Sequence, residues 1–312
     1  MKKNIFSLLL TLLFFFMLFR PEETFHGASE GLLLWFQIIL PTLFPFIIIT
    51  NLLIATDTLY DISRLASPVI SPIFQTSPAG TFAVIAGFLC GYPMGAKVTG
   101  DLFRDGKISR NEAMYLLSFC NNTSPVFIMN YVVLKTLKNK ELLLPSLCIL
   151  FLAPFLTSFF FRRIYKMKTY KKQTDIPNTI PRIRFHFDLI DHTIMNGFET
   201  ITKVGGYIIL FSVLIALLKD LPIVSPLWNL IFLPSLEITN GIMMLASSGV
   251  AFPIIFPFTM ALISFGGICS IAQTQCMIQG TRLPLLPYIA EKLITAIVTS
   301  LLTIFYLHFI YI

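Results

Sequence analysis

Polar and helix-breaking residues interrupt long apolar stretches in the first half of this chain. They lie at Gly91-Tyr92-Pro93 and at Asn121-Asn122-Thr123-Ser124-Pro125. A break in a membrane helix exposes backbone N–H and C=O groups, which are tolerated only where they are buried in protein or line a cavity. Two such breaks close together are typical of a transporter substrate site. Close helix packing stays open as an alternative for the first segment, since GFLCG and GYPMG both match GxxxG.

The composition predicts a membrane protein with several spans. Hydrophobic residues make up 55% of the 312 residues and charged residues only 12%, whereas a soluble domain carries about 25% charged residues. Apolar runs of about 20 residues, the length that crosses a bilayer, recur along the chain. The five cysteines lie in or beside these runs without a CxxC pair, which favours buried thiols over a disulfide. The four histidines are scattered, so we expect no metal site.

The net charge of +7 lies in one segment. Residues 162–184 contain eight Lys or Arg and one Asp, which equals the net charge of the whole chain. A basic segment beside an apolar run is typical of a cytoplasmic loop of a membrane protein. We therefore expect no nucleic-acid partner, and contact with anionic lipid headgroups is an alternative role for the loop.

The apolar runs and the basic loop together predict a topology. Five crossings before the loop would place it outside, against the positive-inside rule, whereas a re-entrant hairpin at 62–97 leaves four crossings and a cytoplasmic loop. Lys2 and Lys3 place the N-terminus in the cytoplasm, and a retained first helix is expected over a cleaved signal peptide. The predicted fold class is an all-α polytopic membrane protein with about seven transmembrane helices, at 5–20, 31–55, 111–133, 142–161, 205–218, 251–277 and 284–309, and two re-entrant hairpins at 62–100 and 221–248.

The elements after the basic loop repeat the order of those before it, with the opposite orientation. Each half contains a span, a hairpin, a broken helix and a span, and the breaks of the second half are EITNG from Glu237 and GGICS from Gly266. Such an inverted repeat is typical of secondary transporters. The expected domains are an N-terminal helix at 1–30, a first repeat at 31–161, a basic cytoplasmic loop at 162–186 and a second repeat at 187–312.

Two local patterns predict where helices begin. Ser109-Arg110-Asn111-Glu112 fits a capping box, which starts a helix at about residue 111. Apolar residues recur at helical spacing over 187–201. This predicts an amphipathic helix on the cytoplasmic surface, separate from the span at 205–218.

Long motifs in both halves resemble a known family. GYPMGAK followed by ISRNEAMYLLSFCNNTSPVFI resembles the YlbJ-type sporulation integral membrane proteins. VGGYIILFSVLIALL and LEITNG resemble the nucleoside-recognition (Gate) domain, which this family carries twice. The resemblance covers residues 30–310 and makes both repeats Gate-like. The layout is also similar to concentrative nucleoside transporters, where two hairpin tips and two unwound helices meet at the substrate. The resemblance to the YlbJ-type proteins implies an endospore-forming bacterium and passage of dipicolinic acid across the outer forespore membrane.

By position, the resemblance places the substrate-binding residues at the four breaks. They are Gly91, Tyr92, Pro93, Lys97, Asn121, Asn122, Thr123, Ser124, Glu237, Thr239, Asn240, Gly266, Gly267 and Ser270. Half-helix N-termini favour anions. Lys97 is either the counter-charge of a dicarboxylate or a side chain that reaches the cytoplasmic surface. Glu237 either binds a coupling cation or proton, or caps a helix at the outer interface.

These observations favour a transporter of a small polar anion over an enzyme. We find no carboxylate pair, Ser-His-Asp set or phosphate-binding loop, so we expect no catalytic residues and no cofactor beyond a coupling proton or sodium ion. A nucleoside-type carrier is one alternative, because a shared fold does not fix the substrate. A non-transporting assembly protein of the spore envelope is another. The expected partners are the anionic substrate and the lipid bilayer, and a homo-oligomer stays open.

Overall fold

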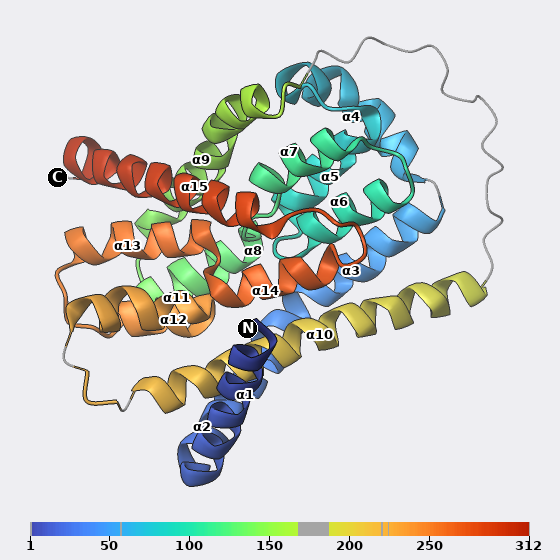
Figure 1. The fold of residues 1–312 in the computed structure, drawn as a ribbon. Helices are drawn as coiled ribbons and strands as arrows, with labels where there is room; N and C mark the ends of the chain where they lie inside the picture. The colour runs from blue at the N-terminus through green and yellow to red at the C-terminus, as the bar shows by residue number, and fades with distance from the viewer. Residues whose placement is uncertain (1, 57, 168–186, 220, 224, 312) are drawn as a thin grey trace.

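The computed structural model describes residues 2–56, 58–167, 187–219, 221–223 and 225–311, and the regular elements within them are helices (Figure 1). The basic loop predicted at 162–186 falls largely outside these residues. The helices are α1 Lys2–Phe19, α2 Pro21–Leu34, α3 Leu40–Ala55, α4 Thr58–Phe74, α5 Pro78–Leu89, α6 Met94–Arg104, α7 Arg110–Cys120, α8 Pro125–Phe127, α9 Leu143–Ile164, α10 Phe187–Lys219, α11 Leu233–Leu236, α12 Ile238–Ala246, α13 Phe252–Phe265, α14 Gly267–Met277 and α15 Leu285–Tyr306.

Short irregular turns continue several of these helices. A π-helical stretch, Trp35–Ile39, joins α2 to α3, so the backbone is helical from Pro21 to Ala55. The other π-helical stretches are Ile128–Leu137, Trp228–Phe232 and Leu307–Tyr311, and Lys140–Leu142 is a 3₁₀ turn. The domain boundary expected between residues 30 and 31 therefore lies inside α2.

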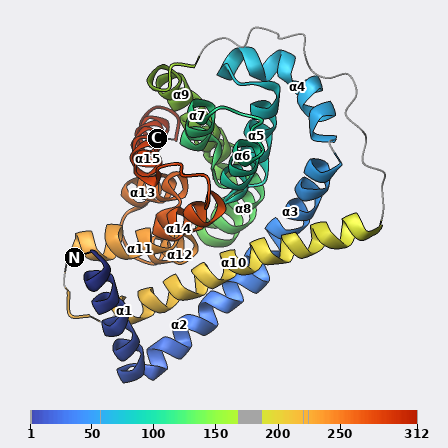
Figure 2. The ribbon, with the colours of Figure 1, turned by 45° about the vertical axis from the view of Figure 1, so that its right-hand side comes forward.

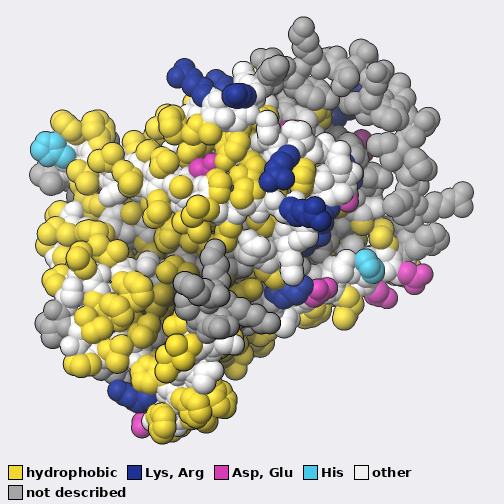
Figure 3. Space-filling model, viewed as in Figure 1, with side chains coloured by type: hydrophobic (Ala, Val, Ile, Leu, Met, Phe, Trp, Pro, Cys, Tyr) yellow, Lys and Arg dark blue, Asp and Glu magenta, His cyan; other side chains and the backbone are white. Residues whose placement is uncertain are grey.

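The helices form two groups (Figure 2). The long helix α10 lies along α2 and α3 at one side of the molecule, and α1 packs against α2. The other helices form a bundle in which α15 packs against α7, α9 and α13. Figure 3 shows hydrophobic side chains over α13, α15 and α12, whereas Lys and Arg gather toward α6 and α7. This division is typical of a lipid-facing belt with a charged end.

Five described helices are long and apolar enough to cross a membrane, namely Pro21–Ala55, Lys140–Ile164, Phe187–Lys219, Phe252–Met277 and Leu285–Phe309. The described part of the chain is therefore all-helical and has the features of a multi-pass membrane protein. The expected span at 5–20 appears as a shorter apolar helix, Ser7–Phe19. The expected span at 111–133 consists of two short helical pieces. The count of seven spans thus stays a prediction.

Residues 187–219 form one continuous helix, α10, rather than a surface helix followed by a span. No proline interrupts this segment, and Gly205 lies inside the helix against the ring of Trp35. The Trp35 Nε1–H also donates a hydrogen bond to the Ile201 carbonyl, at 3.0 Å. The prediction of two separate elements was therefore wrong, because packing against α2 and α3 supports the helix through its glycine pair.

Two glycines allow α2 and α10 to cross closely. A Cβ on Gly27 would lie 2.8 Å from the Cα of Val213, and one on Gly31 would lie 2.8 Å from the Cα of Ile209. Glycines spaced by four residues let two helix backbones approach each other within a membrane. The crossing of α2 and α10 fixes α10 beside α3. Both α3 and α10 contribute residues to the cavity described below.

The first predicted hairpin is built from α4, α5 and α6. The axes of Asp61–Phe74 and Pro78–Leu89 differ by 87°, and a break at residues 90–93 separates α5 from α6. A Cβ on either Gly87 or Gly95 would overlap the carbonyl oxygen of Cys120 at the end of α7. The spacing of Gly87 and Gly95 therefore lets α5 and α6 approach the end of α7 closely.

The start of α7 confirms half of the predicted capping box. The Glu112 N–H donates to the Ser109 Oγ, at 3.2 Å, so Ser109 is the N-cap. The Glu112 carboxylate does not return to Ser109 but accepts from the Ser77 N–H, at 2.6 Å. Because Ser77 is itself the N-cap of α5, Glu112 links the starts of two helices of the first half.

Candidate functional site

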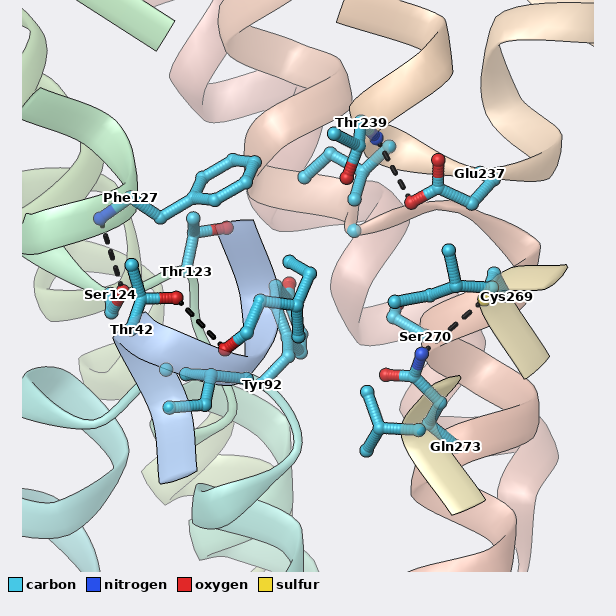
Figure 4. A pocket seen from close by; sticks show the side chains of 17 residues that line it. Thr42, Tyr92, Thr123, Ser124, Phe127, Glu237, Thr239, Cys269, Ser270 and Gln273 are labelled. Atoms are coloured by element: carbon cyan, nitrogen blue, oxygen red, sulfur yellow. Dashed lines mark hydrogen bonds between the residues drawn. The ribbon is translucent and has the colours of Figure 1, made fainter. Parts of the chain in front are cut away.

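The four predicted breaks meet at one cavity (Figure 4). Tyr92, Thr123 and Ser124 lie on one side of it, and Glu237, Thr239, Ser270 and Gln273 lie on the other. Its volume is about 50 Å³. The lining residues are Ile39, Thr42, Leu43, Gly91, Tyr92, Thr123, Ser124, Phe127, Val204, Ile208, Glu237, Ile238, Thr239, Gly266, Cys269, Ser270 and Gln273. We call this space the central cavity.

The first break, at residues 90–93, is packed tightly against the second. Gly91 has a φ of +86°, which glycine adopts without steric cost. A Cβ there would lie 2.7 Å from the Cβ of Ser124. The peptide bond between Tyr92 and Pro93 is cis, and the Tyr92 hydroxyl donates to the Ser264 carbonyl, at 2.9 Å. The tip of the first hairpin therefore touches broken helices of both halves.

The second break, at residues 121–124, is held by side chains from distant helices. The Asn121 Nδ2 donates to the Thr274 Oγ1 at 2.8 Å and to the Tyr288 hydroxyl at 2.9 Å. Its Oδ1 accepts from the Ala96 N–H, at 3.3 Å. Asn121 is fully buried, so it fixes the break to α6, α14 and α15 rather than facing a solute.

Thr123 and Ser124 complete the second break. The Thr123 Oγ1 donates to the Ile263 carbonyl, at 2.9 Å. The Ser124 Oγ accepts from the Phe127 N–H, at 3.2 Å, and so caps the helix that resumes at Pro125. Both side chains line the central cavity, which brings the second break against the fourth.

The third break is the single residue Glu237, between α11 and α12. Its Oε1 accepts from the Thr239 N–H at 3.0 Å, and its Oε2 accepts from the Asn240 N–H at 2.9 Å. The carboxylate is the N-cap of α12, where the helix dipole favours negative charge. Its side chain is 1% exposed. The structure therefore shows a cap that is buried beside the central cavity, and whether Glu237 also binds a cation or proton stays a prediction.

The fourth break lies at Gly266, between α13 and α14. Gly266 has a φ of +86° and Gly267 a φ of +78°, so both adopt a conformation that favours glycine. A Cβ on Gly266 would lie 2.7 Å from the Tyr92 ring, and one on Gly267 would lie 3.0 Å from the Ser235 carbonyl oxygen. These close approaches bring the fourth break against the first and the third.

Eight of the fourteen predicted substrate-binding residues line the central cavity: Gly91, Tyr92, Thr123, Ser124, Glu237, Thr239, Gly266 and Ser270. The other six, Pro93, Lys97, Asn121, Asn122, Asn240 and Gly267, do not. Asn240 lies behind Glu237, where its Nδ2 donates to the Ser212 Oγ at 2.8 Å and to the Glu237 Oε2 at 2.9 Å. The structure thus brings the breaks together, while binding by these residues stays a prediction.

Lys97 lines a second cavity, of about 410 Å³, together with Asp101, Arg104, Glu199 and Lys203. The Lys97 Nζ lies 3.0 Å from the Asp101 Oδ2 and donates to the Asn51 Oδ1 at 3.2 Å. Asn196, Thr200, Cys276, Met277, Gln279 and Gly280 complete this lining. Lys97 is therefore not a counter-charge within the central cavity.

Sequence analysis did not identify several residues that line the central cavity. Ile39, Thr42 and Leu43 come from the long helix that contains α3, and Val204 and Ile208 come from α10. These residues are apolar or common in membrane helices, so no local signal marks them. Among the described residues, no three His, Cys, Asp or Glu side chains gather in a way that holds a metal ion.

Lys292 was also missed. It lies in the middle of α15 and is 1% exposed. Its Nζ donates to the Asn121 carbonyl at 3.0 Å and to the Asn122 Oδ1 at 3.2 Å, and lies 5.1 Å from the centre of the Tyr92 ring. A lysine within an apolar span was a signal in the sequence, because ionisable residues at membrane depth are costly and often functional.

Comparison with known proteins agrees with the resemblance read from the sequence. The chain is 32% identical over 215 residues to "Sporulation integral membrane protein YlbJ" of Bacillus subtilis (strain 168). The match covers 64% of this chain and 52% of that protein, so the chain spans about half the length of this curated relative. No family model and no solved structure matches. The predicted resemblance to the YlbJ-type proteins is confirmed over the matched residues.

Proposed function

We propose that this chain is a membrane transporter that carries a small polar solute during spore formation. One observation carries the proposal: four helix breaks, two from each half of the chain, line one cavity (Figure 4). Interrupted helices at membrane depth are typical of substrate and ion sites in secondary transporters. The name of the similar protein supports the link to sporulation.

The central cavity must enlarge to hold a solute of this kind. Its volume of about 50 Å³ accommodates a few water molecules, since one water needs roughly 10–15 Å³ on this measure. The second cavity offers a route to it, because the first hairpin, α10 and α14 contribute residues to both cavities. Val204 and Lys203 are neighbours on α10, and Gln273 and Cys276 lie within one turn on α14. We infer that movement of the two halves joins the cavities.

We propose the second cavity as the cytoplasmic entrance. It contains Arg104, and Lys107 and Arg110 follow in the chain, as the positive-inside rule expects for that face. With this orientation the N-terminus is cytoplasmic and the two halves form an inverted repeat of two Gate-like units. For localisation we propose the outer forespore membrane, on the resemblance alone.

Dipicolinic acid is the first candidate substrate. The resemblance implies it, and the second cavity holds three cationic side chains against two carboxylates, a balance that attracts an anion. Within the central cavity, the charge of Glu237 is offset by the N-terminus of α12, to which its carboxylate is hydrogen-bonded. Among the lining hydroxyls, Thr239 Oγ1 has no hydrogen-bond partner in the described chain and Ser124 Oγ accepts from the Phe127 N–H, so these two hydroxyls have a hydrogen to donate to the solute.

A nucleoside-type solute is the second candidate. Glu237 is the one ionisable carboxylate in the described lining of the central cavity. A carboxylate accepts hydrogen bonds and donates none while it is ionised. It therefore suits a neutral solute with several hydroxyl donors better than a second carboxylate. The charge of Glu237 therefore favours a neutral nucleoside over an anion such as dipicolinate.

Uptake into liposomes tests the proposal. The purified chain is reconstituted, and the uptake of labelled dipicolinate and of labelled uridine is measured against liposomes without protein. We expect saturable uptake of dipicolinate, and its loss when Asn121→Ala is combined with Glu237→Gln at equal amounts of folded protein. Gly206→Ala is the matched control, because a Cβ there meets no atom within 4 Å.

Each outcome of this assay decides between the candidates. Uptake of uridine with no uptake of dipicolinate would favour the nucleoside-type carrier. Uptake of neither solute by folded protein would favour a non-transporting assembly protein of the spore envelope. Equal uptake by the double variant and the wild type would remove the second and third breaks from the account.

A further inference from the structure

Lys292 lies where the first two breaks meet, outside the lining of the central cavity. Its aliphatic chain is enclosed in the bundle, and its Nζ has three neighbours: the Asn121 carbonyl oxygen, the Asn122 Oδ1 and the face of the Tyr92 ring. An ammonium group has three N–H donors and no acceptor. Two oxygens and one aromatic face therefore match its three hydrogens.

No carboxylate of the described chain forms an ion pair with Lys292. Its sequence neighbour Glu291 points elsewhere and accepts a hydrogen bond from the Tyr165 hydroxyl. A buried charge is costly unless polar groups compensate for it. Here the compensation comes from the oxygens that a broken helix exposes, because the Asn121 carbonyl lies just beyond the end of α7.

Carbonyl and amide oxygens of unwound helices are also the ligands that bind sodium ions in secondary transporters. The oxygens at Asn121 and Asn122 are of this kind, and in this chain they receive the ammonium of Lys292. The Tyr92 ring adds a cation–π contact, which stabilises a cation of either sort.

We propose that Lys292 is a tethered cation, which takes the place of a bound monovalent metal ion between the first and second breaks. It holds the tip of the first hairpin against the broken helix of the same half, and it makes the folded protein independent of sodium. Removal of the ammonium leaves a site for a monovalent cation. The link to transport rests on the proposed function, whereas the cation site itself does not.

Thermal melting in detergent tests the proposal in sodium chloride and in choline chloride at equal ionic strength. Wild type is expected to melt at the same temperature in both salts. Lys292→Ala is expected to melt several degrees lower in choline chloride and to recover in sodium chloride, because the truncated side chain leaves room for the ion. Lys292→Met is the matched control, since it fills the space without charge and is expected to stay low in both salts.

A second substitution locates the ion. Adding Asn122→Ala to Lys292→Ala removes one oxygen of the vacated site, so the rescue by sodium is expected to be lost. Saturable binding of ²²Na⁺ to the wild type that Asn122→Ala abolishes would overturn the proposal, even if Lys292→Ala does not fold. Equal melting of Lys292→Ala in both salts would overturn it as well. If the wild type carries no solute in liposomes, the proposed function fails while the melting data still decide on the tethered cation.

Discussion

The two halves of the chain break their helices in different ways. In the first half each break spans four residues, at 90–93 and 121–124, whereas in the second half each break is one residue, Glu237 or Gly266. The single-residue breaks are satisfied locally, by the Glu237 carboxylate at the start of α12 and by the Gly266 N–H, which donates to the Leu262 carbonyl at 2.8 Å. The four-residue breaks need partners from the other half.

The second break draws its side-chain partners from the second half of the chain. Asn121 is held by Thr274 and Tyr288, and its carbonyl accepts from Lys292. All three partners lie in α14 or α15. The second half therefore supplies the partners of Asn121, and the first half in turn supplies the Tyr92 and Thr123 hydroxyls to the Ser264 and Ile263 carbonyls at the end of α13.

Gly87→Val gives the largest expected effect, because it places a side chain where the backbone of α5 comes closest to the end of α7. A Cβ at Gly87 would overlap the Cys120 carbonyl, and a backbone atom cannot move aside as a flexible side chain can. We expect little folded protein after solubilisation, measured by size-exclusion chromatography.

Gly206→Ala is the control for that substitution. A Cβ there meets no atom within 4 Å, and alanine is favoured over glycine inside a helix by roughly 0.5–1 kcal/mol. We expect a melting temperature equal to or above that of the wild type. If Gly87→Val folded as well as Gly206→Ala, the close packing of the first half would be refuted.

Glu237→Ala tests the local cap of the second half. It leaves the Thr239 and Asn240 N–H groups without their acceptor beside a buried cavity, which costs roughly 1–3 kcal/mol for each unsatisfied group. We expect a large loss of stability for Glu237→Ala and a smaller loss for Glu237→Gln, which keeps one acceptor. Thermal melting measures both losses. Equal stability of both variants would show that the carboxylate does not cap α12.

Asn121→Ala tests the dependence of the first half on the second. It removes the hydrogen bonds to Thr274 and Tyr288 and the acceptor of the Ala96 N–H, for a loss of roughly 1–3 kcal/mol. If the second half supports this break, Thr274→Val should add little to Asn121→Ala in a double-mutant cycle. Fully additive losses would contradict the coupling.

Ser109→Ala has the smallest expected effect. It removes the N-cap of α7, which costs about 1 kcal/mol, and leaves the second half untouched. A melting temperature lower by a few degrees with unchanged solute uptake is expected. A loss of uptake would show that the start of α7 influences the central cavity.

The sequence was informative where a local pattern determines the backbone. The four breaks could be predicted because glycine, proline or polar residues interrupt apolar runs at Gly91-Tyr92-Pro93, at 121–125, at Glu237 and at Gly266-Gly267, and a membrane helix tolerates such interruptions only with local repair. Ser109 was recognised as a cap for the same reason. Each of these features depends on a few neighbouring residues.

The remaining features depend on contacts between distant segments. Lys292 and Asn121 are 171 residues apart in the chain, so no spacing rule connects them. Lys97 and Gly91 are close in sequence, yet α6 directs Lys97 toward the second cavity. A surface helix over 187–201 and a span at 205–218 were expected as separate elements, but packing of Gly205 against Trp35 keeps α10 continuous.

Protection of a native thiol tests the central claim most directly. Cys269 lines the central cavity and is 2% exposed, whereas Cys148 is exposed elsewhere. The purified wild type is treated with a small neutral thiol reagent, and modification of each cysteine is followed by mass spectrometry with and without dipicolinate. The account predicts that the solute slows modification of Cys269 and leaves Cys148 unchanged. An unchanged rate at Cys269, with saturable uptake in liposomes, would place the solute elsewhere and contradict the account.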